Sequence, residues 1–291
     1  MVGTPEKMKI LVTGANGMLS NDVLELPKKH SEFSHLEFFP FTRKELNITD
    51  MDALISVVDE IKPQVVFNGA AFTKVDDCET AVGQEQANLV NGSGPVFLGD
   101  ICREREIKLI NISTDYVFPG NGTKPYKEDE ETNPINNYGL SKLQGEKNTA
   151  FSGCDYLTFR TAWLYGHHGP NFVATMLKLA ETHKELRVVN DQMGSPTWTG
   201  DLAYGIFKLL MKGESGLYHL TNSGQCTWYD FAVEIFRLYE KDVKVIPVSS
   251  DEFKRPAQRP TYSVLDNSAY ENDSGYQMPS WQDALKRFKE S

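Results

Sequence analysis

The fold of this chain is decided by the stretch Ile10-Leu11-Val12-Thr13-Gly14-Ala15-Asn16-Gly17-Met18-Leu19-Ser20. Its apolar, β-branched start predicts a buried strand, and Gly14 predicts a tight turn at the end of that strand. Glycines between a strand and a helix let the backbone approach a pyrophosphate, which the helix N-terminus can bind. An ordinary tight turn is the alternative. Ser20 stands where a third glycine is usual, so we expect it to hold the helix slightly further from the sheet.

Strands and helices alternate along the first half of the chain. Apolar runs predict further strands at 36–41, 65–67, 107–112 and 156–159. The predicted helices run from near Gly17 to before Pro27, from Thr49 or Asp50 to Ile61, over 84–105 with a disturbance at Gly92, Gly94 and Pro95, and from Pro134 to about Asn148. This order predicts right-handed βαβ units and an α/β fold, a Rossmann-type doubly wound parallel sheet. The glycine turn then follows the first strand of the sheet, which favours a dinucleotide site.

The rhythm loosens in the second half. Helices are predicted at 171–183, 201–212, 228–239 and 280–289, with a proline-containing loop at 248–260. We interpret 8–160 as a nucleotide-binding domain that is completed by parts of 199–240. Residues 161–291 are mainly a smaller α/β substrate-binding lobe, interleaved with the first domain.

Charge and cysteine content narrow the class of protein. The net charge of −10 disfavours a nucleic-acid partner, although local groups can still bind a phosphorylated ligand. Cys78, Cys102, Cys154 and Cys226 form no CxxC pair and are predicted to be reduced thiols of a cytoplasmic protein. Residues 1–7 are polar and do not resemble a signal peptide. No apolar run approaches the ~18 residues of a membrane span, so no membrane partner is expected.

The end of the second predicted strand bears on the cofactor. An acidic residue at this point would bind the ribose 2′-hydroxyl of NADH, whereas an arginine accommodates a 2′-phosphate. Thr42 and Arg43 therefore favour NADPH, with NADH possible. A solvated basic turn is the alternative interpretation.

Two further motifs carry the chemistry. Tyr138 and Lys142 are four residues apart in a predicted helix, so they share one face. A neighbouring cation lowers the pKa of a phenol, which suits Tyr138 as a general acid or base. Thr114 follows the fourth strand, and ligands of such sheets bind beyond the carboxyl ends of the strands. Each motif alone also fits a surface pair or a turn, but the order of glycine turn, hydroxyl and YxxxK is specific.

Taken together, these motifs resemble the extended short-chain dehydrogenase/reductase superfamily. Within it, the chain resembles the dTDP-4-dehydrorhamnose reductase family from about residue 8 to 290. The resemblance is carried by residues 68–73, 113–118, 138–146, 161–166, 191–197 and 259–266. It implies reduction by NADPH of the 4-keto group of dTDP-4-dehydro-6-deoxy-L-mannose to dTDP-L-rhamnose.

The resemblance also implies residue roles. Tyr138 would protonate the sugar oxygen, Lys142 would lower the pKa of Tyr138 and hold the nicotinamide ribose, and Thr114 would hydrogen-bond the keto oxygen. The implied cofactor contacts are Gly14, Asn16, Gly17, Met18, Leu19, Thr42, Arg43, Asn47, Ile48, Ala70, Ala71, Phe72, Tyr138 and Lys142. The implied substrate contacts are Thr73, Thr114, Asp115, Tyr116, Tyr138, Trp163 and Arg259, the last suited to a pyrophosphate.

Four positions refine this resemblance. Related sugar-nucleotide 4,6-dehydratases carry Thr-Asp-Glu where this chain has Thr-Asp followed by Tyr116, so elimination of water lacks one of its proton carriers. Phe72 stands where tyrosine is more frequent in the family, and Asn47 where aspartate is usual. Gly69 replaces an alanine beside the cofactor, with little expected effect.

Other residues receive plainer interpretations. Asp22 matches an acidic position that some family members use for a divalent ion at a dimer contact, but a helix-surface carboxylate is the preferred reading. Metal binding is not expected at the adjacent His167 and His168 or elsewhere. Trp198, Trp228 and Trp281 are expected to pack rather than stack on ligands, and the acidic run 128–131 to be a solvated loop.

Two other functions stay open. One is a non-catalytic NADP-binding regulatory subunit, which the same family includes, and the other is a reductase of another nucleotide-linked keto-sugar. The expected assembly is a monomer or a homodimer.

Overall fold

A computed structural model describes residues 7–291. The prediction that the chain does not begin with a signal peptide rests mainly on residues 1–6, which lie outside the described residues. Within 7–291, the search for a helix of sufficient length and apolar character to span a membrane found none.

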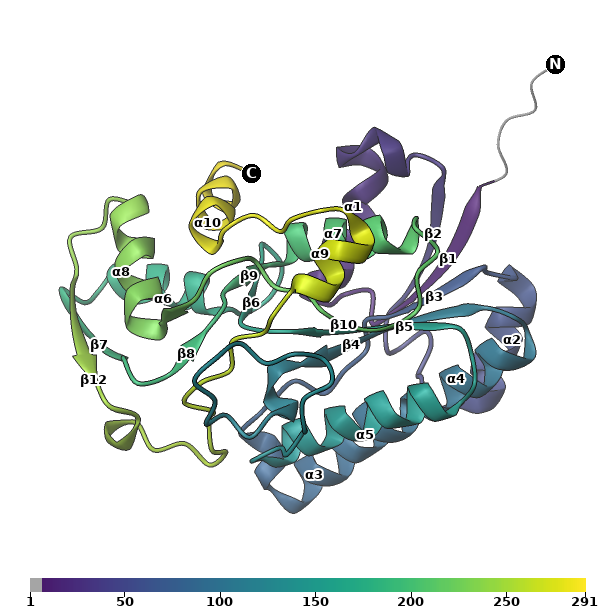
Figure 1. Cartoon of the computed structure of the whole chain (residues 1–291), viewed down its shortest axis with the longest axis horizontal. Coiled ribbons are helices and arrows are strands. Elements are labelled where there is room, and N and C mark those ends of the chain that lie inside the picture. Colours follow the sequence, from purple (N-terminus) through teal and green to yellow (C-terminus); the bar gives the residue numbers. More distant parts are fainter. Residues whose placement is uncertain (1–6) are drawn as a thin grey trace.

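The described part is an ordered succession of short strands and helices (Figure 1). The strands are β1 (Met8–Thr13), β2 (Leu36–Phe41), β3 (Val65–Asn68), β4 (Lys108–Thr114), β5 (Tyr156–Thr161), β6 (Leu164–Tyr165), β7 (Glu185–Val189), β8 (Met193–Gly194), β9 (Thr197–Trp198), β10 (Gly216–His219), β11 (Cys226–Thr227) and β12 (Lys244–Val248). The α-helices are α1 (Met18–Lys29), α2 (Met51–Ile61), α3 (Ala81–Ala87), α4 (Gly94–Glu104), α5 (Asn137–Phe151), α6 (Phe172–Ala180), α7 (Thr199–Leu210), α8 (Trp228–Leu238), α9 (Ser268–Ser274) and α10 (Trp281–Glu290). Short helical turns are η1 (Ser31–Phe33), η2 (Asp77–Glu79), the π-helix η3 (Asn88–Ser93), η4 (Asp115–Val117) and η5 (Ser250–Glu252).

The predicted doubly wound parallel sheet is confirmed. Within residues 7–291, six strands pair in the order β10-β5-β4-β3-β1-β2, and every pairing is parallel. The strand order reverses between β1 and β3, because β2 pairs on one side of β1 and β3 on the other, and ligands of such folds bind at this reversal. The sequence analysis did not identify β10, which completes the sheet beside β5.

Helices cover both faces of this sheet (Figure 1). Ile10 and Val12 of β1 pack under α1 and α7, while Leu11 between them points to the face covered by α2 and α4. This alternation follows from the two-residue side-chain period of a strand. Both faces are apolar, so the strand is a continuous hydrophobic run, as expected for a buried parallel sheet.

The second half contributes a separate apolar cluster. Helices α6, α8 and α10 surround the buried side chains of Tyr165 and Phe231, next to the small pairing of β7 with β12. Figure 1 shows this part beyond one end of the large sheet. It joins the sheet through loops after its strands, because Tyr262 N donates to Gly120 O and Thr197 N donates to Trp163 O.

Two helix predictions were affected by proline and glycine. The prediction that the first helix stops before Pro27 is wrong, because α1 continues to Lys29. Pro27 lies in the last turn, where its missing N–H removes a single helical hydrogen bond, and the buried Leu26 keeps that turn on the core. The disturbance predicted at Gly92 and Gly94 is confirmed, because the helix changes to a π-helix over Asn88–Ser93.

Candidate active site

The glycine turn lies against the loops that follow β2 and β3. Gly14 has φ +61, and a Cβ on it would lie 2.6 Å from Ala70 N. Ala15 N donates a hydrogen bond of 3.0 Å to Phe41 O at the end of β2. Only glycine therefore fits at position 14, both for its backbone conformation and for space. The structure brings together the three segments that the sequence assigned to the cofactor.

Ser20 and Gly69 depend on one another. A Cβ on Gly69 would lie 2.2 Å from Ser20 Oγ and 2.9 Å from Thr13 O. Ser20 Oγ is buried and has no hydrogen-bond partner among residues 7–291. The hydroxyl at position 20 therefore occupies the space that an alanine methyl group at position 69 would need. The expectation that Gly69 has little effect does not hold, because the two departures from the family pattern are coupled.

The loop after β2 supplies a side chain that sequence reasoning missed. Both the backbone N–H and the hydroxyl of Thr42 donate to Glu45 Oε2, each at 2.8 Å. Arg43 is exposed beside them, as a 2′-phosphate contact requires. Ile48 is buried against the apolar core and under Gly94, so only its backbone can face a cofactor. Asn47 accepts a hydrogen bond from Thr49 N at 3.3 Å.

Asn91 connects the loop after β3 to the helix that carries Tyr138. It accepts from Phe72 N at 2.8 Å, donates to Phe72 O at 2.9 Å and donates to Ser141 Oγ at 3.0 Å. Ser141 Oγ in turn donates to Tyr138 O at 2.8 Å. Asn91 was not among the predicted site residues. The disturbed helix around Gly92 was the available signal, because π-helical turns are frequent at functional sites.

Thr114, Tyr116 and Tyr138 meet where β4 ends and α5 begins. Thr114 is the last residue of β4, and its hydroxyl is hydrogen-bonded to Tyr138 and donates to Asp115 Oδ1 at 2.9 Å. The rings of Tyr116 and Tyr138 are 5.8 Å apart, edge to face. Gly139 makes this contact possible, because a Cβ there would lie 2.2 Å from Tyr116 O. Ala71 and Thr73 are exposed on the loop after β3.

Burial sets the ionisation of these groups. The pKa of Tyr138 is raised, mainly by burial and further by the charge of Asp115, while the Thr114 hydrogen bond opposes the shift. The predicted lowering of this pKa by Lys142 is therefore wrong for this structure, because Lys142 is not among the groups that act on the Tyr138 phenol and loss of solvation dominates. Burial lowers the pKa of Lys142 to about 8, opposed by the Glu146 carboxylate. Burial also raises the pKa of Asp115 to about 6, and the Thr114 hydrogen bond is among the groups that oppose it.

The loop that carries Arg259 is fixed to the loop after β3. Arg259 lies 3.0 Å from Asp76 Oδ1, and the same carboxylate oxygen accepts from Ala257 N at 3.2 Å. Arg259 also lies close enough to Tyr116 to lower the pKa of its phenol. Asp76 was missed by sequence reasoning, which had no indication that the two loops meet.

Trp163 is held in an uncommon conformation. Its φ of 49 lies in the left-handed region, where a bulky residue is strained. Its indole ring stacks on Trp228 with centroids 3.5 Å apart, and a Cβ on Gly194 would lie 2.4 Å from it. The interpretation of Trp228 as a packing residue is confirmed, and the ring it packs against is a predicted substrate contact.

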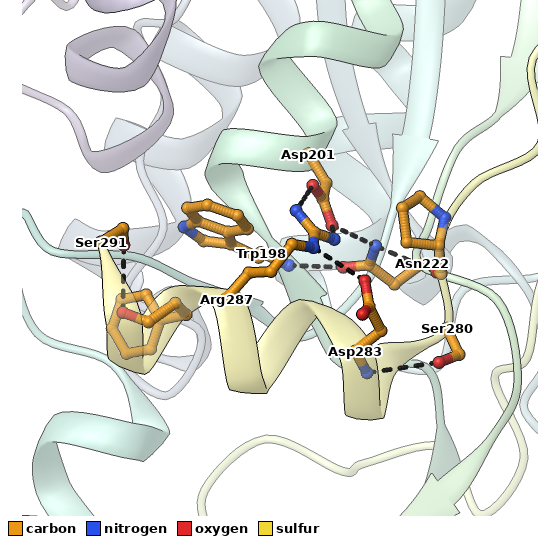
Figure 2. A network of polar contacts seen from close by, with 9 residues as sticks. Trp198, Asp201, Asn222, Ser280, Asp283, Arg287 and Ser291 are labelled. Carbon is orange, nitrogen blue, oxygen red and sulfur yellow. Dashed lines mark hydrogen bonds and ion pairs between the residues drawn. The ribbon is translucent and has the colours of Figure 1, made fainter. Parts of the chain in front are cut away.

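Asp22 differs from expectation, whereas residues 129–131 of the acidic run are exposed in a loop as predicted and only Glu128 is partly covered. Asp22 is buried at 4% exposure and accepts from Thr199 Oγ1 at 2.6 Å, so the helix-surface interpretation is wrong. Across the same pocket, of about 230 Å³, Asp201 binds Arg287 with two bonds of 2.7 Å (Figure 2). A search of the described residues for three or more His, Cys, Asp or Glu able to hold a metal found no group. Glu128 is only partly exposed, because its carboxylate accepts from His219 N at 2.9 Å.

Known proteins similar to this chain span nearly its whole length. The family model described as RmlD substrate binding domain matches residues 8–291. The chain is 42% identical over 277 residues to the dTDP-4-keto-6-deoxy-D-glucose reductase of Streptomyces niveus, covering 94% of each. It is 42% identical over 283 residues to the dTDP-4-dehydrorhamnose reductase of Streptomyces griseus, covering 94% of this chain and 91% of that one. The crystal structure of dTDP-4-dehydrorhamnose reductase from Bacillus anthracis in complex with NADP is 38% identical, with a TM-score of 0.92, covering 97% of this chain and 99% of that chain.

Proposed function

Because the chain belongs to the RmlD substrate binding domain family, we propose that it reduces the 4-keto group of dTDP-4-dehydro-6-deoxy-L-mannose with NADPH, giving dTDP-L-rhamnose. It is an NADP(H)-dependent oxidoreductase. The observation that carries the proposal is the contact of Thr114, at the carboxyl end of β4, with Tyr138 of α5, whose next turn carries the buried Lys142.

The residues present fit a dinucleotide. Gly14 and Gly17 leave backbone N–H groups uncovered at the N-terminus of α1, where the helix dipole favours a pyrophosphate. Thr42 and the exposed Arg43, directly after β2, would hold the 2′-phosphate, and Lys142 would hold the nicotinamide ribose. When bound, NADPH supplies the hydride for the sugar carbon. The interleaved lobe formed mainly by residues 161–291 would close over the sugar.

Tyr138 acts as the proton donor. Its raised pKa keeps the phenol neutral at neutral pH, and an acid must carry its proton when the alkoxide develops. The Thr114 hydroxyl, which donates to Asp115 in this structure, turns to the keto oxygen and orients it. The charge of Lys142 stabilises the phenolate that remains on Tyr138.

The substrate groups would be divided between two parts of the site. Asp115, Tyr116 and the Trp163 ring would contact the sugar, and the exposed Thr73 would contact it from the loop after β3. Arg259, oriented by Asp76, directs its free donors to the pyrophosphate. A second candidate substrate is favoured by the Streptomyces niveus relative, whose name specifies a D-glucose configuration.

The test follows loss of NADPH absorbance with the keto-sugar made in situ by a dehydratase, with and without the epimerase. We expect oxidation by the wild type and at least about a hundredfold loss for Tyr138→Phe, because general acid catalysis contributes that much. Tyr229→Phe in α8 is the matched control and should retain turnover. Oxidation without the epimerase would favour the second sugar. NADPH binding with no oxidation of either sugar would support the regulatory alternative and refute the reductase.

The assembly and its location are also part of the proposal. We propose that the protein acts as a monomer or a homodimer. The cytoplasm is favoured because all four cysteines, which lie within the described residues, are free and buried.

A further inference from the structure

A buried row of polar groups lies directly behind the proposed catalytic residues. Glu146 is 7% exposed and Arg160 4% exposed, and Arg160 Nη2 donates to Glu146 Oε2 at 2.8 Å. Arg160 Nε also donates to both oxygens of this carboxylate, at 3.0 and 3.2 Å. Such a pair is costly to bury unless its geometry is good and its remaining positions are filled. The proposed mechanism leaves this pair without a role.

Glu146 contacts both elements that carry catalytic groups. It lies one helical turn after Lys142 on the buried face of α5. Its Oε1 accepts a hydrogen bond from Ser113, which directly precedes Thr114 in β4. One carboxylate therefore joins α5 to the strand that supplies the hydroxyl for the substrate.

The buried row contains more positive charges than negative ones. Arg160 also donates to Glu128 O at 3.2 Å and lies 3.3 Å from His219 Nε2. Burial and the neighbouring Arg160 lower the pKa of His219 to about 3, so this ring stays neutral at neutral pH. Among these described groups, Glu146 is the carboxylate that binds Arg160, and it also raises the pKa of Lys142, one helical turn before it.

We propose that Glu146 is a positioning residue for the reduction: its carboxylate, bound to Ser113 of β4 and Arg160 of β5, holds Tyr138 and Lys142 of α5 in place beside Thr114. The inference rests on the proposed function, because it assumes that these three residues act on the substrate and cofactor. It is consistent with the opposing effects on Lys142, whose pKa burial lowers and Glu146 raises.

The remaining groups near the site do not change in the test. Asp115 in η4 and Cys78 in η2 act on the pKa of Tyr138, and Arg259 acts on that of Tyr116. Glu128 binds the backbone of His219 rather than Lys142. Glu128→Gln is therefore a matched control that changes a carboxylate in the same row without removing the carboxylate that raises the pKa of Lys142.

The experiment compares Glu146→Gln, Arg160→Met and the double variant. Glu146→Gln should lower kcat about tenfold and move the alkaline limb of the kcat/KM profile about one pH unit lower, since one pKa unit is a factor of ten in the ionisation equilibrium. Arg160→Met should move this alkaline limb to higher pH, because the charge of Glu146 is then no longer shared with Arg160 and raises the pKa of Lys142 further. The double variant removes both buried charges, so it is expected to fold and to retain the low kcat and the lowered limb.

Recovery of wild-type kcat and pH profile in the double variant would show that Glu146 only neutralises Arg160, and would overturn the proposal. The proposal would also be overturned if Glu128→Gln moved the alkaline limb of the kcat/KM profile as far as Glu146→Gln does. The pH dependence of NADPH affinity, followed by fluorescence, gives a second readout of Lys142 that does not need turnover. If the wild type fails to oxidise NADPH, the proposed function fails, and opposite affinity shifts in the two single variants would still support the role of Glu146.

Discussion

Replacing Gly69 by alanine tests how the glycine turn is held. The added Cβ would lie 2.2 Å from Ser20 Oγ, 2.9 Å from Thr13 O and 3.2 Å from Phe67 Cε1. Two of these neighbours lie on strands of the central sheet and cannot move independently. Overpacking of this kind costs about 1–3 kcal/mol, and we expect the upper part of that range for Gly69→Ala.

The reciprocal change should act in the opposite direction. Ser20 Oγ is buried with no partner among the described residues, so Ser20→Ala should stabilise the fold by about 1 kcal/mol, because an unpaired buried hydroxyl is costly. In the double variant the closest contact is removed and that to Thr13 O remains. The cost of Gly69→Ala should therefore fall by about 1–2 kcal/mol when serine 20 has been replaced.

The assay is urea unfolding of the cofactor-free protein, together with NADPH titration. Gly69→Ala should also weaken NADPH binding, because it would displace the neighbouring Ala70, which packs closely against Gly14 of the glycine turn. Adding Ser20→Ala should restore part of the NADPH affinity. The coupling would be refuted if the changes in unfolding free energy of the two single variants summed to that of the double variant within about 0.5 kcal/mol.

Three further predictions concern ionisation and substrate contact. The pKa of Asp115 is about 6 in the fold against its ordinary value of 3.8, so stability is lost as pH rises through this interval. Asp115→Asn should thus raise the free energy of unfolding by up to about 3 kcal/mol at pH 7.5 and leave it unchanged below about pH 4. An equal gain in the free energy of unfolding at both pH values would contradict a raised pKa of Asp115. Since the pKa of Lys142 is about 8, kcat/KM should decline above that pH in the wild type, and a profile that stays level to about pH 10 would contradict the burial of this ammonium. Trp228→Ala removes the ring that stacks on Trp163. Because a ring stack contributes about 1 kcal/mol or more, the substitution should raise the KM of the sugar about tenfold with little change in kcat. An unchanged KM in steady-state assays would show that Trp163 does not depend on Trp228 for its position.

The sequence was sufficient for the sheet because its signals are local. A strand such as β1 reads as an unbroken apolar run when both its faces are covered, and Gly14 marks the turn at its end. The strand β10 was missed because Gly216–His219 is short and mixed in character, and it joins the sheet only by pairing with β5. Helix α1 passes Pro27 because packing of Leu26 outweighs one missing hydrogen bond.

The candidate site divides in the same way. The residues Thr114, Tyr138 and Lys142 lie within motifs, so their spacing along the chain identified them. Asn91 and Asp76 act through contacts with segments far away in the sequence, and a side-chain amide or carboxylate in a helix or loop gives no local signal of its partner. The pKa of Tyr138 was mispredicted for a related reason, because burial is a property of the assembled fold and here has the largest effect on the phenol.

The same burial explains why Tyr116 fits reduction and not elimination. The pKa of Asp115 is already raised to about 6 by loss of solvation, and its charge raises that of Tyr138. A glutamate at position 116 would add a second anion beside both groups, and like charges at one site raise each other's pKa values. That arrangement supplies the extra protonated acid that loss of water requires. With a tyrosine there, whose own pKa is raised by burial, the site retains a neutral phenol at Tyr138 as its single proton donor to the sugar oxygen, which is the one proton that a carbonyl reduction consumes.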